Sequence, residues 1–344
     1  MQTLIRIDRL KSCKGISFVI TVLVTGCGGA IGLGAIKALR MGSMKLRLIG
    51  SDADPYAAIF YMKNTLLDKT CHLPDSDHPN YIPEVINLCR KENVDVIFPC
   101  TDAELEKLAI SKNDFTDRGT KIIISSPETI GICRDKWLTY NHLGKFLPIV
   151  KSALLDIGIK QALQFTGLPA VIKPRVGWGS KQTYKVRNAE EAQIFMKDIS
   201  KPVVQTWLEG EDYTVDCIAD RNGKAISVVP RRRIKIFSGL SFEGITVRDQ
   251  KLMEIGKKIA KCLRFYGPFN FQAKKVDGEP KIFEINPRFS GTGILTVKAG
   301  VNIPLLAVKE TCNIKIPTNI DFEEGIILSR YFDEVTFKLP KGES

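Results

Sequence analysis

A continuous run of mostly β-branched residues at 19–25 leads directly into a glycine loop at 26–32. A strand without polar alternation is typical of parallel sheets that helices cover on both faces. The pattern predicts a helix from this loop to about Arg40. Further strands are predicted at 45–50, 95–99 and 121–125. With helices in the gaps, the first 125 residues are expected to form a doubly wound α/β unit.

The glycine loop, together with Asp52 after the second strand, has the outline of a dinucleotide site. The glycines are spaced GxGxxxG, however, with Ile31 where the third glycine of GxGxxG would stand. Glycines at such positions also allow a helix to pack closely on a strand. A nicotinamide oxidoreductase that binds NAD at residues 26–32 and Asp52 is therefore kept as an alternative.

The formal net charge of +12 at pH 7 suits an anionic partner, such as a nucleotide or an acidic metabolite. Nucleic acid is the less attractive partner, because no aromatic residues are interleaved with the basic run at 231–235. A non-catalytic module that binds anions is a second alternative, and it rests on this charge.

Cysteine and histidine usage indicates neither a zinc site nor a disulfide framework, since the nine cysteines form no CxxC pair and only three histidines are present. The scattered thiols favour a protein of the reducing cytoplasm. The apolar run at 16–24 contains Ser17 and Thr21 and is too short for a membrane span, so no membrane partner is expected.

One short stretch combines a carboxylate, an amide and a guanidinium. In a strand, Glu284 and Asn286 would share one face, with Phe283 and Ile285 toward the core. Carboxylate and amide oxygens suit Mg²⁺, which usually binds one or two carboxylates together with substrate phosphates. Arg288 is placed to clamp a phosphoryl group. An edge strand with its polar residues in water is the alternative.

This strand is predicted to pair with the strand before it through a turn within 277–280. A two-residue Asp-Gly turn would set Phe271 opposite Glu284, whereas a three-residue loop would set Gln272 opposite it. The second register would gather Gln272, Glu284 and Asn286 around one metal ion.

A basic loop with glycines at 174–181 follows a predicted strand at 168–173. Glycines allow the backbone to approach a ligand, and successive N–H groups beside cations form a cradle for anions. The loop lacks the GxxxxGK[ST] pattern of a Walker A loop. A solvated hairpin turn is the alternative.

Two further segments are candidates for ligand contacts. Residues 203–216 are predicted to form a strand, a turn and a strand, where backbone groups can read an adenine edge and Asp212 can accept from ribose hydroxyls. Arg231 and Arg233 share a strand face with Lys235, and this face would bind phosphates or a substrate carboxylate. Solvated surface charge is the alternative for both.

These segments, in this order, resemble the ATP-grasp superfamily, most closely the large chain of carbamoyl phosphate synthetase and its single-unit relatives. The resemblance covers residues 19–312 and rests on residues 135–136, 171–174, 205–215, Gln272 and 284–288. It implies an α/β and α+β architecture, with a doubly wound pre-ATP-grasp domain followed by a two-lobed ATP-grasp domain. The implied division is a tail at 1–18, a Rossmann-like pre-ATP-grasp domain at 19–126, a small lobe at 127–202 and a large lobe with the catalytic strands at 203–344.

The resemblance also implies roles for particular residues. The residues implied to bind ATP are Lys136, Lys173, Gly177, Gly179, Ser180, Gln205, Leu208 and Asp212. The metal ligands are Gln272, Glu284 and Asn286, for Mg²⁺ or alternatively Mn²⁺. Lys173 and Arg288 would act catalytically on the phosphoryl group, and Arg231 and Arg233 would bind the substrate. Gln205 and Asp212 each stand where many relatives have Glu.

The function that the resemblance implies is an ATP-dependent carboxylate-amine ligase, which forms an amide through an acylphosphate and releases ADP and phosphate. Within the family, phosphorylation of bicarbonate or carbamate is an alternative. The expected partners are ATP and small carboxylate and amine substrates. The sequence does not identify these substrates, and it leaves a homodimer open.

Overall fold

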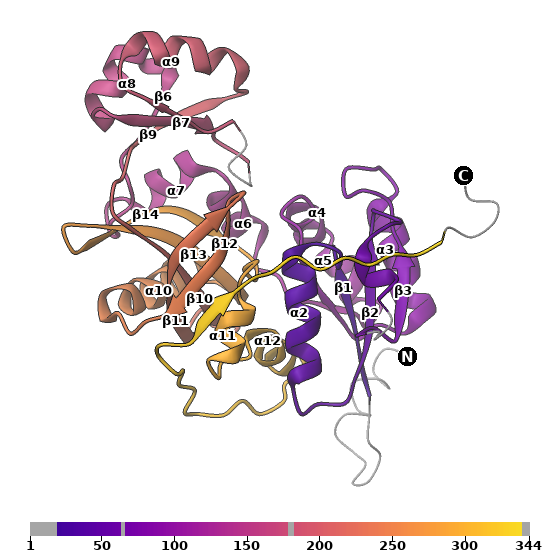
Figure 1. The fold of residues 1–344 in the computed structure, drawn as a ribbon. Helices are drawn as coiled ribbons and strands as arrows, with labels where there is room; N and C mark the ends of the chain where they lie inside the picture. The colour runs from indigo at the N-terminus through magenta and orange to yellow at the C-terminus, as the bar shows by residue number, and fades with distance from the viewer. Residues whose placement is uncertain (1–18, 63–65, 178–181, 339–344) are drawn as a thin grey trace.

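The computed structural model describes residues 19–62, 66–177 and 182–338. It consists of an N-terminal α/β domain, a small lobe that projects from the rest of the molecule, and a large lobe (Figure 1). Within the described ranges, no helix is both long enough and apolar enough to cross a membrane.

The N-terminal domain is built on a parallel five-stranded sheet in the order β3-β2-β1-β4-β5. Its strands are β1 Ile20–Thr25, β2 Leu46–Asp52, β3 Lys69–His72, β4 Val96–Phe98 and β5 Lys121–Ile122. Its helices are α2 Ala30–Met41, α3 Tyr81–Glu92, α4 Leu105–Ile110 and α5 Lys112–Thr116, with a short 3-10 turn at Ala58–Phe60. Every residue of β1 is buried, which explains its unbroken apolar run. The doubly wound prediction is confirmed, while the short edge strand β3 was not predicted.

The glycine loop after β1 is bonded to its own domain. The Cys27 N–H donates to the Ser51 carbonyl at 3.0 Å, and the Gly28 N–H donates to the Asp52 carboxylate at 2.7 Å. Gly32 allows α2 to pack closely on this loop, since a Cβ at this position would lie 2.3 Å from the Gly26 carbonyl oxygen and would overlap it. The glycines therefore serve close packing of helix on strand.

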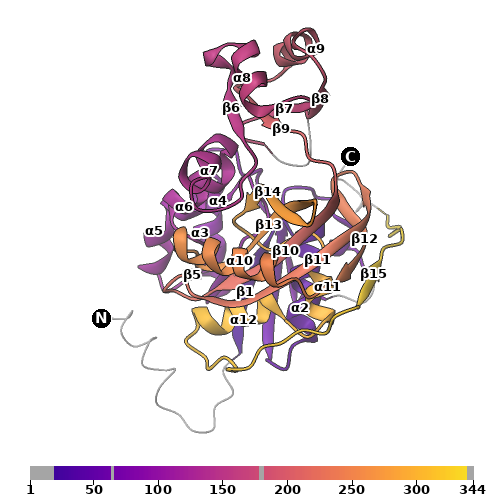
Figure 2. The same cartoon turned by 90° about the vertical axis from the view of Figure 1, so that its left-hand side faces the viewer.

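The small lobe is a four-stranded antiparallel sheet in the order β6-β9-β7-β8, covered by two helices (Figure 2). Its elements are β6 Ser152–Leu154, α8 Ile159–Thr166, β7 Ala170–Pro174, β8 Tyr184–Val186, α9 Ala189–Phe195 and β9 Pro202–Thr206, with 3-10 turns at Leu155–Ile157 and Met196–Asp198. These elements enclose a hydrophobic core of their own.

The predicted limits of the small lobe need two corrections. Strand β9 pairs with β6 and β7, so a boundary at 202/203 would separate it from its sheet. Helices α6 (Pro127–Arg134) and α7 (Lys136–Leu143) share a hydrophobic core with the large lobe instead of the small one. The small lobe therefore extends from β6 to β9, because backbone pairing and core contacts determine the lobe.

The large lobe carries a six-stranded antiparallel sheet in the order β14-β13-β10-β11-β12-β15. Its strands are β10 Glu211–Ala219, β11 Ala225–Phe237, β12 Leu240–Thr246, β13 Gly267–Val276, β14 Glu279–Asn286 and β15 Ile327–Ser329. Its helices are α10 Gln250–Cys262, α11 Ile294–Lys298 and α12 Ile303–Thr311. A last pair of strands was expected within 326–338, but only β15 forms there among the described residues.

One hydrophobic core joins the N-terminal domain to the large lobe. Residues of β1, β2 and α2 pack in the same cluster as Ile218 and Val229 of the large sheet and residues of α11 and α12. Phe289, just after β14, packs edge-on against Phe98 of β4, with ring centroids 6.3 Å apart. The end of the predicted catalytic strand is thus seated on the N-terminal domain.

Candidate active site

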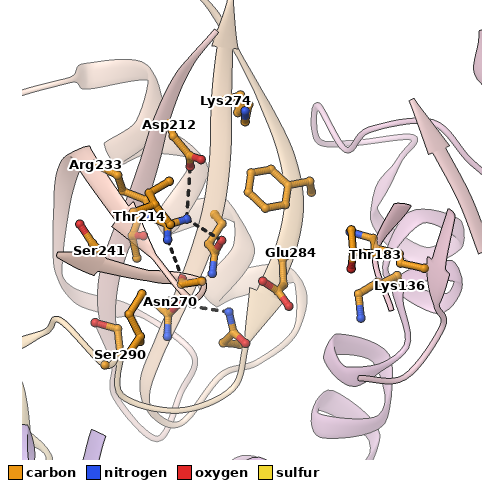
Figure 3. A pocket seen from close by; sticks show the side chains of 18 of the residues that line it. Lys136, Thr183, Asp212, Thr214, Arg233, Ser241, Asn270, Lys274, Glu284 and Ser290 are labelled. Atoms are coloured by element: carbon orange, nitrogen blue, oxygen red, sulfur yellow. Dashed lines mark hydrogen bonds and ion pairs between the residues drawn. The ribbon is translucent and has the colours of Figure 1, made fainter. Parts of the chain in front are cut away.

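A cavity of about 550 Å³ lies where the small lobe, the large lobe and the N-terminal domain meet (Figure 3). It is lined by residues from all three parts. The predicted site residues that line it are Lys136, Lys173, Gly177, Gln205, Leu208, Asp212, Arg233, Gln272, Glu284, Asn286 and Arg288. Gly179 and Ser180 lie outside the described residues. Segments far apart in the sequence thus converge, as the resemblance implies.

Lys136 is held at the first position of α7. Asp135 caps this helix by accepting hydrogen bonds from the Trp137 and Leu138 N–H groups, and its carboxylate also pairs with Arg175, which follows β7. The Lys136 ammonium is largely buried and donates to the Gly177 carbonyl at 3.1 Å. Burial lowers the pKa of Lys136, against the opposing effect of Glu284. An anion entering the cavity would favour its charged form.

Lys173 reaches the cavity from β7. Burial and, to a smaller extent, the nearby Lys136 lower its pKa to about 7, while Glu284 opposes both effects. Its ammonium lies 5.8 Å from the centre of the Phe283 ring. Glu284 therefore favours the charged forms of two lysines from different elements across the cavity. Figure 3 shows Lys136 opposite Glu284.

The hairpin that carries the candidate metal ligands has a register that combines both predicted possibilities. The turn has two residues, because Val276 pairs with Glu279. A β-bulge at Phe283 then shifts the pairing by one residue, so that Gln272 lies opposite Glu284 and Asn270 opposite Asn286. The bulge also corrects the expected position of Phe283, which lines the cavity instead of facing the core.

The donor set of this hairpin fits a hard cation. Glu284 supplies a carboxylate, and Gln272 and Asn286 supply amide oxygens, a set that suits Mg²⁺ bound together with substrate phosphates. Among the described residues, no group of three or more His, Cys, Asp or Glu side chains could hold a metal by itself. The side-chain amide oxygen of Gln272 accepts a hydrogen bond from Arg233 at 3.2 Å, and the side-chain amide oxygen of Asn286 accepts one from Arg288 at 3.3 Å.

Arg231 and Arg233 lie at different depths of the same sheet. Arg233 lines the cavity and contacts the Asp212 carboxylate at 3.5 Å. Arg231 is fully buried and does not line the cavity. It donates two hydrogen bonds to the Asp216 carboxylate, of 2.8 and 2.9 Å, and one each to the hydroxyls of Ser290 and Thr292. The expectation that Arg231 binds substrate is corrected accordingly, because its donors already hold the loop after β14.

The other end of the cavity lies against the strand that leaves the small lobe. Gln205 is buried and donates its amide N–H to the Ser152 hydroxyl at 2.8 Å. Its carbonyl oxygen is buried and has no hydrogen-bond partner among the described residues. Burial raises the pKa of Asp212, while Arg233 opposes this effect. An acceptor and a carboxylate are therefore available at this end.

Several lining residues carry no signal in the sequence. Asp102 forms a bidentate pair with Arg288, with its oxygens 3.0 Å from Nε and 2.8 Å from Nη2. Trp207 also lines the cavity, and the centre of its ring lies 4.4 Å from the ammonium of Lys185. The tip of the β11–β12 hairpin adds Ile236 and Leu240. The one available clue was that Asp102 follows a parallel strand, since ligands bind beyond the carboxyl ends of such strands.

Two family models match this chain. One, described as the PylC-like N-terminal domain, matches residues 22–123. The other, described as ATP-grasp in the biosynthetic pathway with Ter operon, matches residues 198–331.

Curated proteins show the same relationship. The D-alanine–D-alanine ligase of Petrotoga mobilis is 24% identical over 187 residues, which are 49% of this chain and 61% of the relative. The carbamoyl phosphate synthase large chain of Thermoanaerobacter sp. is 26% identical over 319 residues, which are 85% of this chain and 28% of the relative. The chain thus spans less than two thirds of the length of these relatives.

A solved structure has the same fold. The biotin carboxylase domain dimer of the Hydrogenobacter thermophilus 2-oxoglutarate carboxylase, in complex with MgADP, ADP and bicarbonate, matches with a TM-score of 0.71 at 15% identity. The match covers 88% of this chain and 72% of that one. The chain therefore carries an ATP-grasp domain behind a PylC-like N-terminal domain, and it is homologous to the large chain of carbamoyl phosphate synthase and to other ATP-grasp ligases.

Proposed function

We propose that this protein is an ATP-dependent carboxylate-amine ligase, which joins a carboxylate to an amine and releases ADP and phosphate. One observation carries the proposal: Lys136, Lys173 and Glu284, from three separate elements, line one cavity between the lobes. Cations and a metal-binding carboxylate on opposite walls suit a triphosphate between them.

The nucleotide would occupy the end of the cavity that the small lobe covers. Lys136 and Lys173 neutralise phosphate charge, and the unpartnered Gln205 carbonyl oxygen can accept a hydrogen bond from the adenine amino group. The Leu208 backbone lies beside the base, and Asp212 accepts from the ribose. Figure 3 shows Asp212 and Arg233 on the same wall of the cavity.

The metal would be held by Glu284, Gln272 and Asn286. When Mg²⁺ is bound, it neutralises phosphate charge and polarises the phosphoryl oxygens. The Hydrogenobacter thermophilus structure, which has the same fold, contains MgADP, and this supports magnesium as the metal.

The chemistry needs positioning and charge stabilisation from the chain, and no side-chain nucleophile. A substrate carboxylate oxygen attacks the γ-phosphorus, the bond from that phosphorus to the ADP oxygen breaks, and an acylphosphate forms. The amine then attacks the acyl carbon, phosphate leaves, and the nitrogen loses a proton. Lys173 and Arg288 stabilise the charge on the transferring phosphoryl group.

Bicarbonate is a second candidate for the phosphorylated acid. The carbamoyl phosphate synthase match extends over 85% of this chain, and the Hydrogenobacter thermophilus structure of the same fold contains a bicarbonate anion. Bicarbonate is therefore tested beside organic carboxylates.

The test compares wild type with Glu284→Gln, and with Glu279→Gln as a matched control. Glu279 lies on the same strand but is exposed and pairs with Lys251 at the surface. Unfolding is measured with ATP in the presence of Mg²⁺ and in the presence of EDTA, and phosphate release is then measured with bicarbonate and with a panel of carboxylates and amines. Glu284→Gln is expected to remove the Mg²⁺-dependent stabilisation and to reduce phosphate release by about 10²-fold or more.

The control should behave as wild type in both measurements. Phosphate release by Glu284→Gln at the wild-type rate would contradict the metal assignment. Failure of ATP with Mg²⁺ to stabilise the wild-type protein would contradict the nucleotide site itself.

A further inference from the structure

The loop after β4 brings a carboxylate from the N-terminal domain into the ATP-grasp cavity. Asp102 and Arg288 both line that cavity, although 186 residues separate them in the sequence. Their side chains are only 15% and 13% exposed. An arginine fork bonded through two donors has a fixed orientation as well as a charged partner.

Arg288 has further partners that complete its orientation. It donates to the Phe289 carbonyl at 3.1 Å and to the Asn286 side-chain oxygen at 3.3 Å. Through Asn286, the guanidinium reaches one of the candidate metal ligands. Asp102 is the one of these partners that carries a formal charge.

The loop that presents Asp102 is itself fixed from within the domain. Glu104 is 1% exposed, and its carboxylate accepts from the Cys100 and Thr101 N–H groups at 3.0 and 2.9 Å. The hydroxyls of Thr25 on β1 and Tyr81 on α3 donate to the same carboxylate. A buried carboxylate with four donors holds both backbone and charge in place.

The glycine loop of the first domain packs against the same segment. Gly26 has a φ of +57°, and a Cβ there would lie 2.2 Å from the Thr101 methyl group. Gly26 therefore allows the glycine loop to approach the segment that carries Asp102 closely, which adds a second fixed contact to that segment.

From these contacts we infer that Asp102 is a positioning residue for the phosphoryl-transfer site, which holds Arg288 in the orientation that contacts the transferring group. The inference rests on the proposed function, because it takes Arg288 as the residue that meets this group. The N-terminal domain thus contributes to the active site through a side chain that need not touch the nucleotide.

The test uses ADP with Mg²⁺ and aluminium fluoride, a mimic of the transferring phosphoryl group. Affinity for ADP with Mg²⁺ is measured with and without aluminium fluoride, and the ratio is the readout. Asp102→Asn is expected to leave the affinity for ADP with Mg²⁺ unchanged and to reduce the aluminium fluoride ratio by about tenfold. In an Arg288→Met background, Asp102→Asn should change the ratio no further, because the two side chains act as one unit.

The matched control is Asp68→Asn. Asp68 pairs with Arg40 in the same domain at 2.6 Å, and neither residue lines the cavity. This variant should keep the wild-type ratio. Asp102→Glu keeps the charge but displaces the guanidinium, so it should also lower the ratio, and it replaces Asp102→Asn if that variant does not fold.

Each outcome decides between the two ideas. A wild-type ratio in Asp102→Asn, or a wild-type protein to which aluminium fluoride adds no affinity, overturns the positioning role and leaves the nucleotide site standing. A wild-type protein that does not bind ADP with Mg²⁺ overturns the proposed function, and the positioning role falls with it.

Discussion

The loop at the end of β1 and the cavity between the lobes both combine glycines with nearby acids, but they use them differently. In the loop, the Asp52 carboxylate is bonded to the Gly28 and Asp54 N–H groups. In the cavity, buried polar atoms of Gln205 and Arg233 have no hydrogen-bond partner among the described residues. The acid beside the loop is thus occupied by protein donors, whereas the cavity holds polar groups ready for a ligand.

The difference shows that a glycine pattern alone does not define an anion site. Glycine is required wherever a backbone must come close to something, and that neighbour can be protein as well as phosphate. At Gly32 the neighbour is the Gly26 backbone, whereas at Gly177 a Cβ would meet, among the described residues, only Pro174 at 3.5 Å.

The largest expected effect is therefore on stability. Gly32→Ala should lower the free energy of unfolding by about 3 kcal/mol, because the new methyl group would overlap backbone atoms that cannot move aside. Gly177→Ala should leave it nearly unchanged. Urea denaturation of both variants measures the free energy of unfolding. Equal stabilities would show that the loop at 26–32 can accommodate a methyl group at Gly32, which would contradict its packing role.

Ligand stabilisation gives a second comparison. ATP with Mg²⁺ at about 100 times its Kd should raise the free energy of unfolding by about 2.7 kcal/mol. NAD at equal concentration should give no change, because Asp52, the acid that would meet its ribose, already accepts from the Gly28 and Asp54 N–H groups. Thermal unfolding with each ligand distinguishes ATP binding from NAD binding. Stabilisation by NAD alone would contradict the proposed nucleotide site and favour a site at the glycine loop of the N-terminal domain.

The smallest effect concerns the proton on Lys173. Its pKa of about 7 in the ligand-free protein means that it is mostly neutral at pH 8, and bound phosphate would raise this pKa. ATP binding at pH 8 should therefore take up close to one proton, and affinity should fall by about tenfold per pH unit above pH 7.

Calorimetry in two buffers of different ionisation enthalpy measures this uptake. Lys173→Gln should abolish most of it. Affinity that stays constant between pH 7 and pH 9 would show that Lys173 does not meet the phosphates.

The sequence predicted those parts of the molecule that depend on local patterns. The unbroken apolar run of β1 and the spacing of Glu284 and Asn286 on β14 both correspond to observed strands. Residues 135–136, on which the family resemblance partly rests, lie at the start of α7, where Asp135 caps the helix. The family resemblance, and no local pattern, predicted that Lys136, Glu284 and Asn286 would line one cavity.

The remaining features depend on depth and long-range pairing. The alternation of side chains along the strand placed Arg231 and Arg233 on one face, but it could not show that Arg231 is buried and paired with Asp216. The apolar sequence of β9 is compatible with either sheet, and only its pairing with β6 and β7 assigns it. Asp102 was a single acid after a strand, whose partner lies in another domain.

The bulge at Phe283 has a consequence for engineering. On either side of the bulge, Ile282 pairs with Ala273 and Glu284 pairs with Gln272. Phe283 itself has no partner on β13, so its side chain does not determine the register of the two strands. Its ring is nevertheless part of the cavity wall near Lys173. The cavity wall can therefore be made larger or smaller at this one position while Gln272, Glu284 and Asn286 keep their alignment, which makes Phe283 a suitable position for changing the size of the cavity.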